Sequence, residues 1–435
     1  MKKLFLLLLL GTVAVLTMIV YERFIVQGMF GPTSQLAAVL LTGTALFLIA
    51  SYCFYDTQHR ERVRMTWLAL MSIVVSYLAI DLIAGAVLIQ SLSPQLVPDE
   101  VRHHKLVANA YSKFEQQDFS YVQRVNNFGL RGPDITSEKS PDQYRILTMG
   151  DSFTMGKGVE DHQTFSARLE AALNENRPQS CPRTIQVLNG GVDSYAPVLE
   201  YLYLRHELMS LNPDMVILNL DVSDLVQEAA YRAQAVFDNQ GNVLRVPGSE
   251  TRRLLNERIR TWIDQNLYIT RLLLFYTNKL LGYRDLSVRG VVTQANMETA
   301  KHTLVTDDQD RTEQWQMIFS SLSQIKQLCD EQGIEFLLTI YPWGHQVSPD
   351  EWVPGRDYFI PEGAQPSEAS ERTVVSLSAE HGIKLLNQFD LFQTYTGSEP
   401  LYFDNDPHWT VAGQRLMADG LTHYLLDQYS ANWCR

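Results

Sequence analysis

Strand-like apolar runs alternate with helix-like segments from residue 144 to residue 428, and this alternation constrains the fold more than any other feature. Short runs rich in β-branched and aromatic residues, typical of buried strands, occupy residues 144–149, 184–189, 214–220, 335–341 and 384–386. Segments with apolar residues at helical spacing occupy residues 163–175, 197–211, 313–332 and 411–428. Such alternation predicts an α/β fold in which helices cover both faces of a parallel sheet. Sheets of this kind bind ligands outside the carboxyl ends of their strands.

Residues 226–310 interrupt this pattern and form an insertion. Within them, residues 235–246 have the pattern of a hairpin that turns at Gln240-Gly241, and residues 251–282 have a helical pattern. A strongly apolar run lies at residues 272–276. We interpret that run as packing against the core, and an acyl-binding or membrane-proximal surface is the alternative.

Three long apolar runs precede the α/β segment, at residues 4–20, 36–55 and 66–90, and each is long enough to cross a bilayer as a helix. The first follows two lysines, as in a signal peptide, but Tyr21-Glu22-Arg23 stands where the small residues of a cleavage site belong. We therefore expect an uncleaved anchor. The predicted domains are a three-helix transmembrane anchor over 1–92, a linker and lead-in over 93–140, and the α/β domain over 141–435.

Basic residues are distributed unevenly around these runs. The first run follows Lys2 and Lys3, and Arg60, Arg62 and Arg64 lie between the second and the third, whereas the loop between the first two contains only Arg23. The positive-inside rule then places the N-terminus in the cytoplasm and the chain after about residue 93 outside. Asp81 lies within the third run, where a carboxylate is costly in lipid, so we expect its side chain to face another helix.

The charge and the cysteines exclude some classes of protein. The formal net charge of -13 argues against nucleic acid as a partner. None of the four cysteines has zinc-site spacing, so we predict no metal. Cys53 lies in the second run, and the other three fall outside the membrane, where disulfides persist. In a doubly wound sheet, the helices beside Cys181 and Cys434 are often neighbours. We therefore expect a disulfide between these two cysteines and expect Cys329 to be a buried thiol.

Two short segments carry reactive groups. Gly150-Asp151-Ser152-Phe153-Thr154 follows the first predicted strand, and Asp406-Pro407-His408 precedes the last predicted helix. Nucleophilic catalysis by serine requires a base that accepts the hydroxyl proton and an acid that orients the base. Either segment alone could be an ordinary turn. Together they supply all three groups, so we predict Ser152, Asp406 and His408 as catalytic residues that work without a cofactor.

These segments, in this order in an α/β domain, resemble the SGNH (GDSL-like) hydrolase superfamily. The resemblance implies a flavodoxin-like three-layer α/β/α sandwich. The segment around Ser152 is similar to the first block of the superfamily, in which the serine is the nucleophile. Leu188-Asn189-Gly190-Gly191-Val192 is similar to the second block, whose glycine N–H binds the oxyanion, and that position is Gly191.

The last block resembles the Asp-x-His form found in membrane-anchored cell-envelope members such as the alginate O-acetylation proteins. The more common Asp-x-x-His spacing would place Asn405 at the acid position, so Asp406 is the better candidate and Asp404 is the alternative. The lead-in, Asn127-Phe128-Gly129-Leu130-Arg131-Gly132, is also similar to that of membrane-anchored relatives.

The third block departs from the superfamily. It normally reads Gly-x-Asn-Asp, and the asparagine side chain is an oxyanion donor, whereas the matching stretch here is Asp221-Val222-Ser223-Asp224-Leu225. A serine hydroxyl can donate a hydrogen bond, but it is shorter and less fixed than a carboxamide. Loss of one such donor lowers turnover by a factor on the order of 10²–10³. The resemblance therefore implies an oxyanion hole made by Ser152, Gly191 and Ser223.

Trp343 and His345 follow the predicted strand 335–341, at the same end of the sheet as the serine. A substrate-binding role, by sugar stacking or hydrogen bonding, and a packed aromatic beside a solvated histidine both remain open. Four other histidines have no partner at a functional spacing, and we expect them at the surface: His103, His104, His162 and His302.

The resemblance implies a serine-dependent O-acyl esterase or acyltransferase, acetyl-specific in particular, that acts on an extracytoplasmic glycan. It further implies a protein of the bacterial inner membrane with a periplasmic C-terminal domain, and a membrane-bound acyltransferase as a possible partner. A lipase or thioesterase at the membrane is one alternative, motivated by the apolar stretch 267–282. A catalytically silent subunit of a polysaccharide assembly, motivated by Ser223, is another.

Overall fold

The structure is a computed structural model that describes residues 57–88, 96–116, 118–178, 181–248, 267, 269–270, 299–305 and 311–433. The chain divides into two compact units. One comprises residues 1–91 and 251–289, and the other comprises residues 92–250 and 290–435. The second unit therefore includes residues 93–140, which were predicted to be a linker and lead-in.

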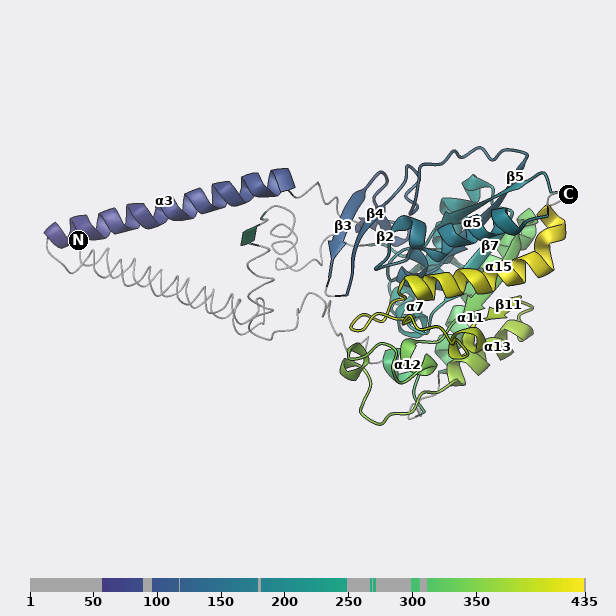
Figure 1. The fold of residues 1–435 in the computed structure, drawn as a ribbon. Helices are drawn as coiled ribbons and strands as arrows, with labels where there is room; N and C mark the ends of the chain where they lie inside the picture. Colours follow the sequence, from purple (N-terminus) through teal and green to yellow (C-terminus); the bar gives the residue numbers. More distant parts are fainter. Residues whose placement is uncertain are drawn as a thin grey trace. The chain divides into compact units, whose positions relative to one another are not determined.

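A five-stranded parallel sheet forms the centre of the second unit (Figure 1). Its strands are β5 (Gln143–Met149), β6 (Thr184–Asn189), β7 (Met215–Leu220), β10 (Glu335–Ile340) and β11 (Leu385–Asn387). They lie in the order β11-β10-β7-β5-β6, and each neighbouring pair is parallel. Numbered along the chain, this is the flavodoxin-like order 2-1-3-4-5. The predicted α/β fold and all five predicted strands are confirmed.

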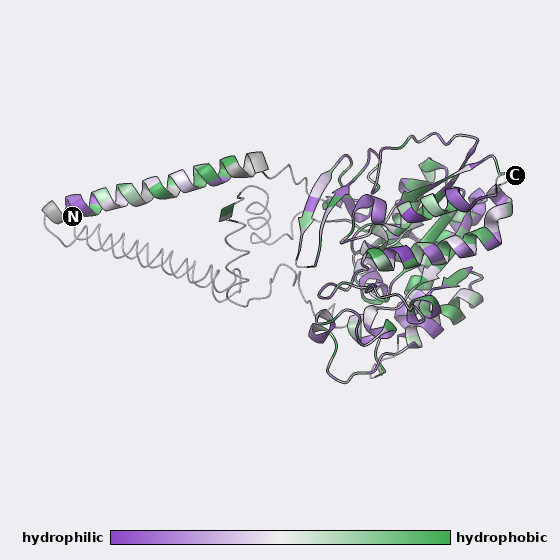
Figure 2. Ribbon diagram, in the orientation of Figure 1, coloured by the Kyte–Doolittle hydropathy of each residue, from purple (hydrophilic) through white to green (hydrophobic). Residues whose placement is uncertain are grey.

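Alternate residues of each strand enter opposite cores, because successive side chains of a strand point to opposite faces. Ile146 and Ile217 pack in a core with α5 (Phe165–Asn176) and α15 (Val411–Trp433). Leu147 and Val216 pack in a second core with other helices. Those helices are α6 (Pro197–His206), α7 (Asp224–Arg232) and α11 (Thr312–Gln332). The result is a three-layer sandwich, and Figure 2 shows hydrophobic stretches along the sheet and mixed colouring on the helices.

The strand order changes direction beside β5, which makes this place the topological switch point of the sheet. The chain after β5 returns through α5, which packs against α15 on one face, whereas the chain after β6 returns through α6, which packs against α11 on the other. Connections that leave to opposite faces open the sheet at the carboxyl ends of the strands between them. Ser152 follows β5 and Ser223 follows β7, so both lie at this edge.

Two antiparallel hairpins precede the sheet, and the sequence did not predict them. β1 (Leu96–Asp99) pairs with β2 (His103–Leu106), and β3 (Tyr111–Glu115) pairs with β4 (Ser120–Arg124). The hairpin predicted within the insertion is present as β8 (Val236–Phe237) and β9 (Val243–Arg245). Its turn is held by Asp238, whose carboxylate accepts the backbone N–H groups of Gln240 and Asn242. The short helices α12 (Gly344–Val347) and α14 (Phe389–Gln393) and the longer α13 (Ala369–Glu380) also went unpredicted.

Helix α3 (Thr57–Leu88) belongs to the first unit and covers most of the third predicted span. Asp81 in this helix is fully buried and accepts hydrogen bonds from the backbone N–H groups of Ile269 and Thr270 and from the Thr270 hydroxyl. Residues 269–270 are helical, so the expectation that Asp81 faces another helix is confirmed. No helix in the described part of the chain, α3 included, is long and apolar enough to cross a membrane. The runs at 4–20 and 36–55 lie outside the described residues.

The cysteines agree in part with expectation. Cys181 is disulfide-bonded, and its predicted partner Cys434 lies outside the described residues. Cys329 is a buried free thiol, as expected. Burial and the nearby carboxylate of Asp330 raise the pKa of Cys329 to about 12, so this cysteine is an unreactive packing residue.

Candidate active site

The nucleophile segment is a tight strand-to-helix connection. β5 ends at Met149, and Ser152 is the first residue of α4 (Ser152–Met155). Asp151 caps this helix by accepting the backbone N–H of Phe153 at 2.8 Å. Gly150 has a φ of +148°, and a Cβ at this position would collide with the side chain of Thr154. Only glycine therefore allows the strand to turn here and present Ser152 at the carboxyl end of the sheet.

The three predicted catalytic residues lie together. The Oγ of Ser152 is 2.6 Å from Nε2 of His408, and Nδ1 of His408 is hydrogen-bonded to Oδ1 of Asp406. The same Asp406 oxygen accepts the backbone N–H of His408 at 3.0 Å. An ionised carboxylate only accepts hydrogen bonds, so Nδ1 is the protonated nitrogen and Nε2 has a free lone pair. His408 is therefore in the tautomer that accepts the Ser152 proton.

Neither Asp404, the alternative acid, nor Asn405, which the more common spacing would place there, reaches the imidazole. The side chain of Asp404 is exposed, and its carbonyl accepts the backbone N–H of Gly355. The amide of Asn405 donates to Asp118 instead. Among the predicted alternatives, only Asp406 contacts His408.

Charge around Asp406 keeps it ionised. Burial would raise the pKa of Asp406, but the charges of His408 and Lys157, with the hydrogen bonds from His408, outweigh burial and hold this pKa well below its usual range. Lys157 follows α4 and is itself partly buried. Burial alone would lower the pKa of Lys157, yet Asp406, Asp193 and other negative groups raise it to about 12. The site thus contains a fixed negative charge on one side of the imidazole and a cation near it.

An aromatic wall holds the imidazole in place. The ring of Phe153 lies 4.6 Å from that of His408, centroid to centroid, and 5.1 Å from that of Trp409. Tyr341, at the end of β10, completes the cluster at 5.2 Å from Phe153. Ser152, Asp406 and His408 are each only 7% exposed. The nucleophile is thus recessed from solvent.

The predicted oxyanion donors have different environments. Gly191 packs so closely against the backbone of α4 that a Cβ would overlap with Met155. Its N–H donates to Oδ1 of Asn189 at 3.0 Å, and the amide of Asn189 donates to the Thr154 carbonyl at 3.0 Å. To bind an oxyanion, the Gly191 N–H would have to share or leave this acceptor. Ser152 is the first residue of its helix, where N–H groups have no acceptor within the helix.

Ser223 is half-buried and immediately precedes α7. Its backbone N–H donates to Asp221 at 3.1 Å, and its hydroxyl is not used to cap the helix. The carboxyl end of β7, which it follows, lies beside that of β5. The hydroxyl is therefore available for a ligand at the edge where Ser152 lies.

Trp343 and His345 are both in the protein interior, each 7% exposed. The indole N–H of Trp343 donates to Asp221 at 2.7 Å, and Nε2 of His345 lies 2.7 Å from the Thr303 hydroxyl. Burial, with a contribution from Arg356, lowers the pKa of His345 to about 3, so the ring is neutral. The structure does not bring these two side chains into contact with the triad.

Of the four histidines expected at the surface, His162 is exposed, as expected, and the other three are not. His302 is 4% exposed, so the expectation is wrong for it. His103 and His104 are partly buried and contact each other, with 2.8 Å between their Nδ1 atoms. Nε2 of His104 lies 2.8 Å from the carbonyl of Asp193, which can only accept, so His104 donates there. These residues pack between the hairpin β1–β2 and the loop after β6.

Asp151, which precedes the nucleophile, belongs to a group of buried carboxyl groups that was not predicted from the sequence. Its members are Asp151, Glu200, Asp221, Asp224 and Glu228, each no more than 4% exposed. Burial, together with the charges of the other members, raises the pKa of Asp151, Glu200 and Asp224 well above the usual values. Within the described residues, Oε2 of Glu200 and Oδ1 of Asp224 have no hydrogen-bond partner. The described part of the chain contains no group of three or more histidines, cysteines and carboxylates that could hold a metal ion.

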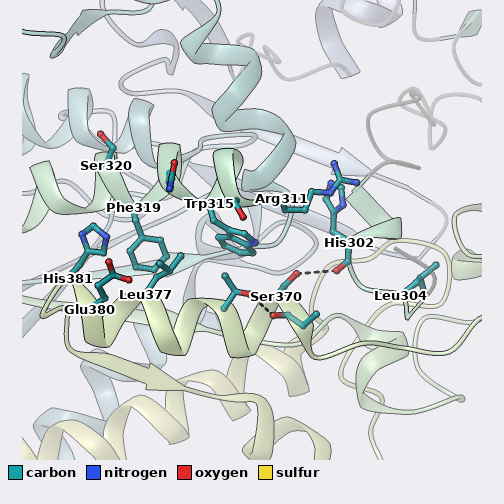
Figure 3. A pocket seen from close by; sticks show the side chains of 14 residues that line it. His302, Leu304, Arg311, Trp315, Phe319, Ser320, Ser370, Leu377, Glu380 and His381 are labelled. Carbon is teal, nitrogen blue, oxygen red and sulfur yellow. Dashed lines mark hydrogen bonds between the residues drawn. The ribbon is translucent and has the colours of Figure 1, made fainter. Parts of the chain in front are cut away.

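A separate cavity of about 750 Å³ lies between α11 and α13. Figure 3 shows Trp315 and Phe319 of α11 facing it, with Ser370 and Leu377 from α13 and His302 at one end. None of its lining residues belongs to the triad or to the predicted oxyanion hole.

No family model and no curated protein matches the chain. Among solved structures it is similar to a catalytic mutant of an acetylxylan esterase from Geobacillus stearothermophilus, with 11% identity, a TM-score of 0.34, and 66% of this chain and 95% of that chain covered. It is also similar to an α/β hydrolase from the metagenome of Lake Arreo, Spain, with 13% identity, a TM-score of 0.34, and 69% and 99% covered. A two-domain esterase active on acetylated mannans has 11% identity, a TM-score of 0.33, and 66% and 50% covered. Similarity at this level says nothing of function, so the chemistry depends on the geometry of the site.

Proposed function

We propose that this protein is a serine-dependent O-acyl esterase or acyltransferase, with acetyl as the acyl group. One observation carries the proposal: Ser152 Oγ lies 2.6 Å from His408 Nε2, while Asp406 holds the other ring nitrogen. A nucleophile, a base and an orienting acid in hydrogen-bonded sequence are the parts that acyl transfer requires.

The mechanism follows from the atoms present. His408 accepts the Ser152 proton through Nε2 as Oγ attacks the ester carbonyl, and Asp406 stabilises the imidazolium that forms. The Ser152 N–H, the Gly191 N–H and the Ser223 hydroxyl are the proposed donors to the oxyanion. His408 then protonates the leaving alkoxide, and the acyl group remains on Ser152. Water resolves the acyl-enzyme in an esterase, and a sugar hydroxyl resolves it in a transferase.

A small acyl group agrees best with the recessed nucleophile. Ser152 is 7% exposed, and the aromatic rings of Phe153 and Trp409 enclose His408. An acetyl ester needs less room beside these packed rings than a long-chain ester does. This argues for acetyl over the long chains that a lipase or thioesterase would use.

The glycan substrate and the location are proposed from the sequence. The resemblance of the Asp406-Pro407-His408 segment to cell-envelope relatives suggests an extracytoplasmic glycan and a membrane-bound acyltransferase partner. The apolar runs at 4–20 and 36–55, and the exposed apolar residues Leu68, Ile73 and Val75 of α3, support an inner-membrane anchor. The basic residues around these runs support a periplasmic α/β domain. Alkaline phosphatase fused after residue 435 is active only outside the cytoplasm, so an inactive but expressed fusion would refute this topology.

The decisive experiment compares the full-length protein with Ser152→Ala in the hydrolysis of p-nitrophenyl acetate. We expect Ser152→Ala to lose turnover by a factor of ~10⁴ or more. Ser376→Ala, at an exposed serine of α13, is the matched control and should retain wild-type turnover. Unchanged turnover in Ser152→Ala would remove the serine from its role.

Two features favour a second candidate, a catalytically silent subunit of a polysaccharide assembly. Ser223 replaces the expected oxyanion asparagine, and the Gly191 N–H is already bonded to Asn189. A fluorophosphonate probe separates the two, because it labels only an activated serine. Labelling of the wild type and not of Ser152→Ala rejects the silent subunit, and no labelling of either rejects the enzyme. A preference for long-chain over acetyl esters would instead favour a lipase or thioesterase.

A further inference from the structure

The turn between β3 and β4 holds the loop that carries the catalytic acid. Oδ2 of Asp118 accepts the backbone N–H groups of Asn405 at 2.8 Å and of Asp406 at 3.0 Å. Oδ1 of Asp118 accepts the side-chain amide of Asn405 at 2.6 Å. One carboxylate from the hairpin therefore binds three N–H groups of the acid loop and determines where Asp406 lies.

The same segment of chain holds the loop that follows the nucleophile. Nη1 of Arg131 donates to the carbonyls of Met155 at 2.8 Å and Gly156 at 2.5 Å, and Nη2 donates to that of Val159 at 2.5 Å. Its Nε donates to Asp161 at 2.9 Å. The side chain of Arg131 is 1% exposed, so water cannot replace these bonds. Met155 is the last residue of α4, and Arg131 thus determines how α4 leaves the site.

Side-chain packing connects the regions around these two contacts. The ring of Phe119, next to Asp118, lies 4.8 Å from that of Phe403 in the acid loop. Gly158 in the nucleophile loop lies against both rings, where a Cβ would overlap with Phe403. The guanidinium of Arg131 lies 5.5 Å from the ring of Tyr121 on β4. Packed side chains thus link the region of Asp118 to that of Arg131.

We infer that Asp118 and Arg131 are positioning residues that set the distance between Ser152 and the His408–Asp406 pair. This inference rests on the proposed function of the triad. Ser152 and His408 are separated by 256 residues and approach each other from two different loops. A displacement of about 1 Å between reacting groups can lower a rate by a factor of ~10². The segment predicted as a linker and lead-in therefore works as part of the active site.

The test replaces Asp118 with Asn in the full-length protein. Asparagine retains one acceptor but turns an NH₂ group toward the N–H donors of the acid loop. We expect kcat for p-nitrophenyl acetate to fall about ten- to a hundredfold with KM changed less than twofold. Asp134→Asn is the matched control. Asp134 also accepts a backbone N–H, from Asn127 at 3.1 Å, but its side chain is exposed and this bond does not involve the acid loop. It should keep wild-type kcat.

A second readout does not depend on activity. The His408 Nδ1 proton bonded to Asp406 gives a low-field proton resonance, which His408→Gln identifies by its loss. We expect Asp118→Asn to shift or broaden this resonance and Asp134→Asn to leave it in place. Arg131→Lys should lower kcat as Asp118→Asn does. If the Arg131→Lys protein does not fold, Asp161→Asn takes its place. That substitution weakens the bond from Nε of Arg131 to the partly exposed Asp161 and should lower kcat several-fold.

The outcomes separate the two proposals. If the wild type neither hydrolyses the ester nor reacts with fluorophosphonate, the proposed function fails, and the resonance alone decides whether Asp118 positions the pair. If Asp118→Asn leaves both kcat and the resonance as in the wild type, the inference is overturned. A rise in KM with kcat unchanged also overturns it, because a positioning residue acts on the chemical step.

Discussion

The hydroxyl oxygen of Ser152 lies 2.6 Å from Nε2 of His408, within reach for direct transfer of its proton. Since Nδ1 of His408 is bonded to Asp406, Nε2 is the free base of the ring. The buried aromatic cluster around the imidazole prevents the ring from turning away. The site is therefore arranged for nucleophilic catalysis before any substrate binds.

Asp406→Asn should lower kcat by a factor of ~10⁴, because an amide cannot stabilise the imidazolium and can select the wrong tautomer of His408. Asp404→Asn is the control, since Asp404 is exposed two residues earlier and has no contact with the imidazole. Steady-state hydrolysis of p-nitrophenyl acetate by both variants gives the answer. Equal losses in the two variants would show that the acid has been assigned wrongly.

Ser223→Asn should raise kcat, if the Ser223 hydroxyl occupies the position of the oxyanion carboxamide, because asparagine donates from a more fixed geometry. Ser223→Ala should lower kcat by up to ~10² through loss of the donor. KM should change little in both variants, since the donor acts on the transition state. Identical kcat in serine, alanine and asparagine proteins would exclude this position from the oxyanion hole.

Glu200→Gln should stabilise the protein at pH 8 more than at pH 5. Burial and the charges of Asp151 and Glu228 raise the pKa of Glu200 in the folded state. Both states are protonated below the unfolded pKa of about 4.3, so this contribution is complete there. As the pH rises, the unfolded chain ionises first, and the free energy of unfolding falls until the folded pKa is passed.

Glutamine does not titrate, and its amide can serve a buried acceptor such as the unpaired oxygen of Asp224. We expect a gain of about 1–3 kcal/mol at pH 8, measured by urea unfolding at the two pH values. Glu175→Gln on α5 is the exposed control and should give no pH-dependent difference. An equal change at both pH values would show that Glu200 is not protonated in the folded protein.

Trp343→Phe should lower stability and leave KM unchanged. The substitution removes the indole N–H that Asp221 accepts at 2.7 Å and leaves a buried carboxylate with one bond fewer. Such a loss costs about 1–3 kcal/mol, which a thermal melt detects. A large rise in KM for an acetylated oligosaccharide, without loss of stability, would instead support the substrate-binding role considered from the sequence.

Local patterns were sufficient for the fold. The strands β5, β6, β7, β10 and β11 and the helices α5, α6, α11 and α15 all have apolar periodicities within their own residues, and a parallel sheet follows from their alternation. The hairpins before β5 escaped prediction because their strands are short, polar and only partly buried, so no strong periodicity marks them. Tertiary packing decided their structure.

The sequence by itself determined which groups could react: a serine after a strand, and a carboxylate two residues before a histidine, are recognisable from neighbouring residues. Only the tertiary structure decided what surrounds them. The burial of Trp343 and of the carboxyl groups of Asp151, Glu200 and Asp224 depends on packing. The contacts of Asp118 and Arg131 join segments distant in the chain. Periodicity and turn chemistry are properties of short stretches, whereas hydrogen-bond partners and burial depend on how those stretches pack together.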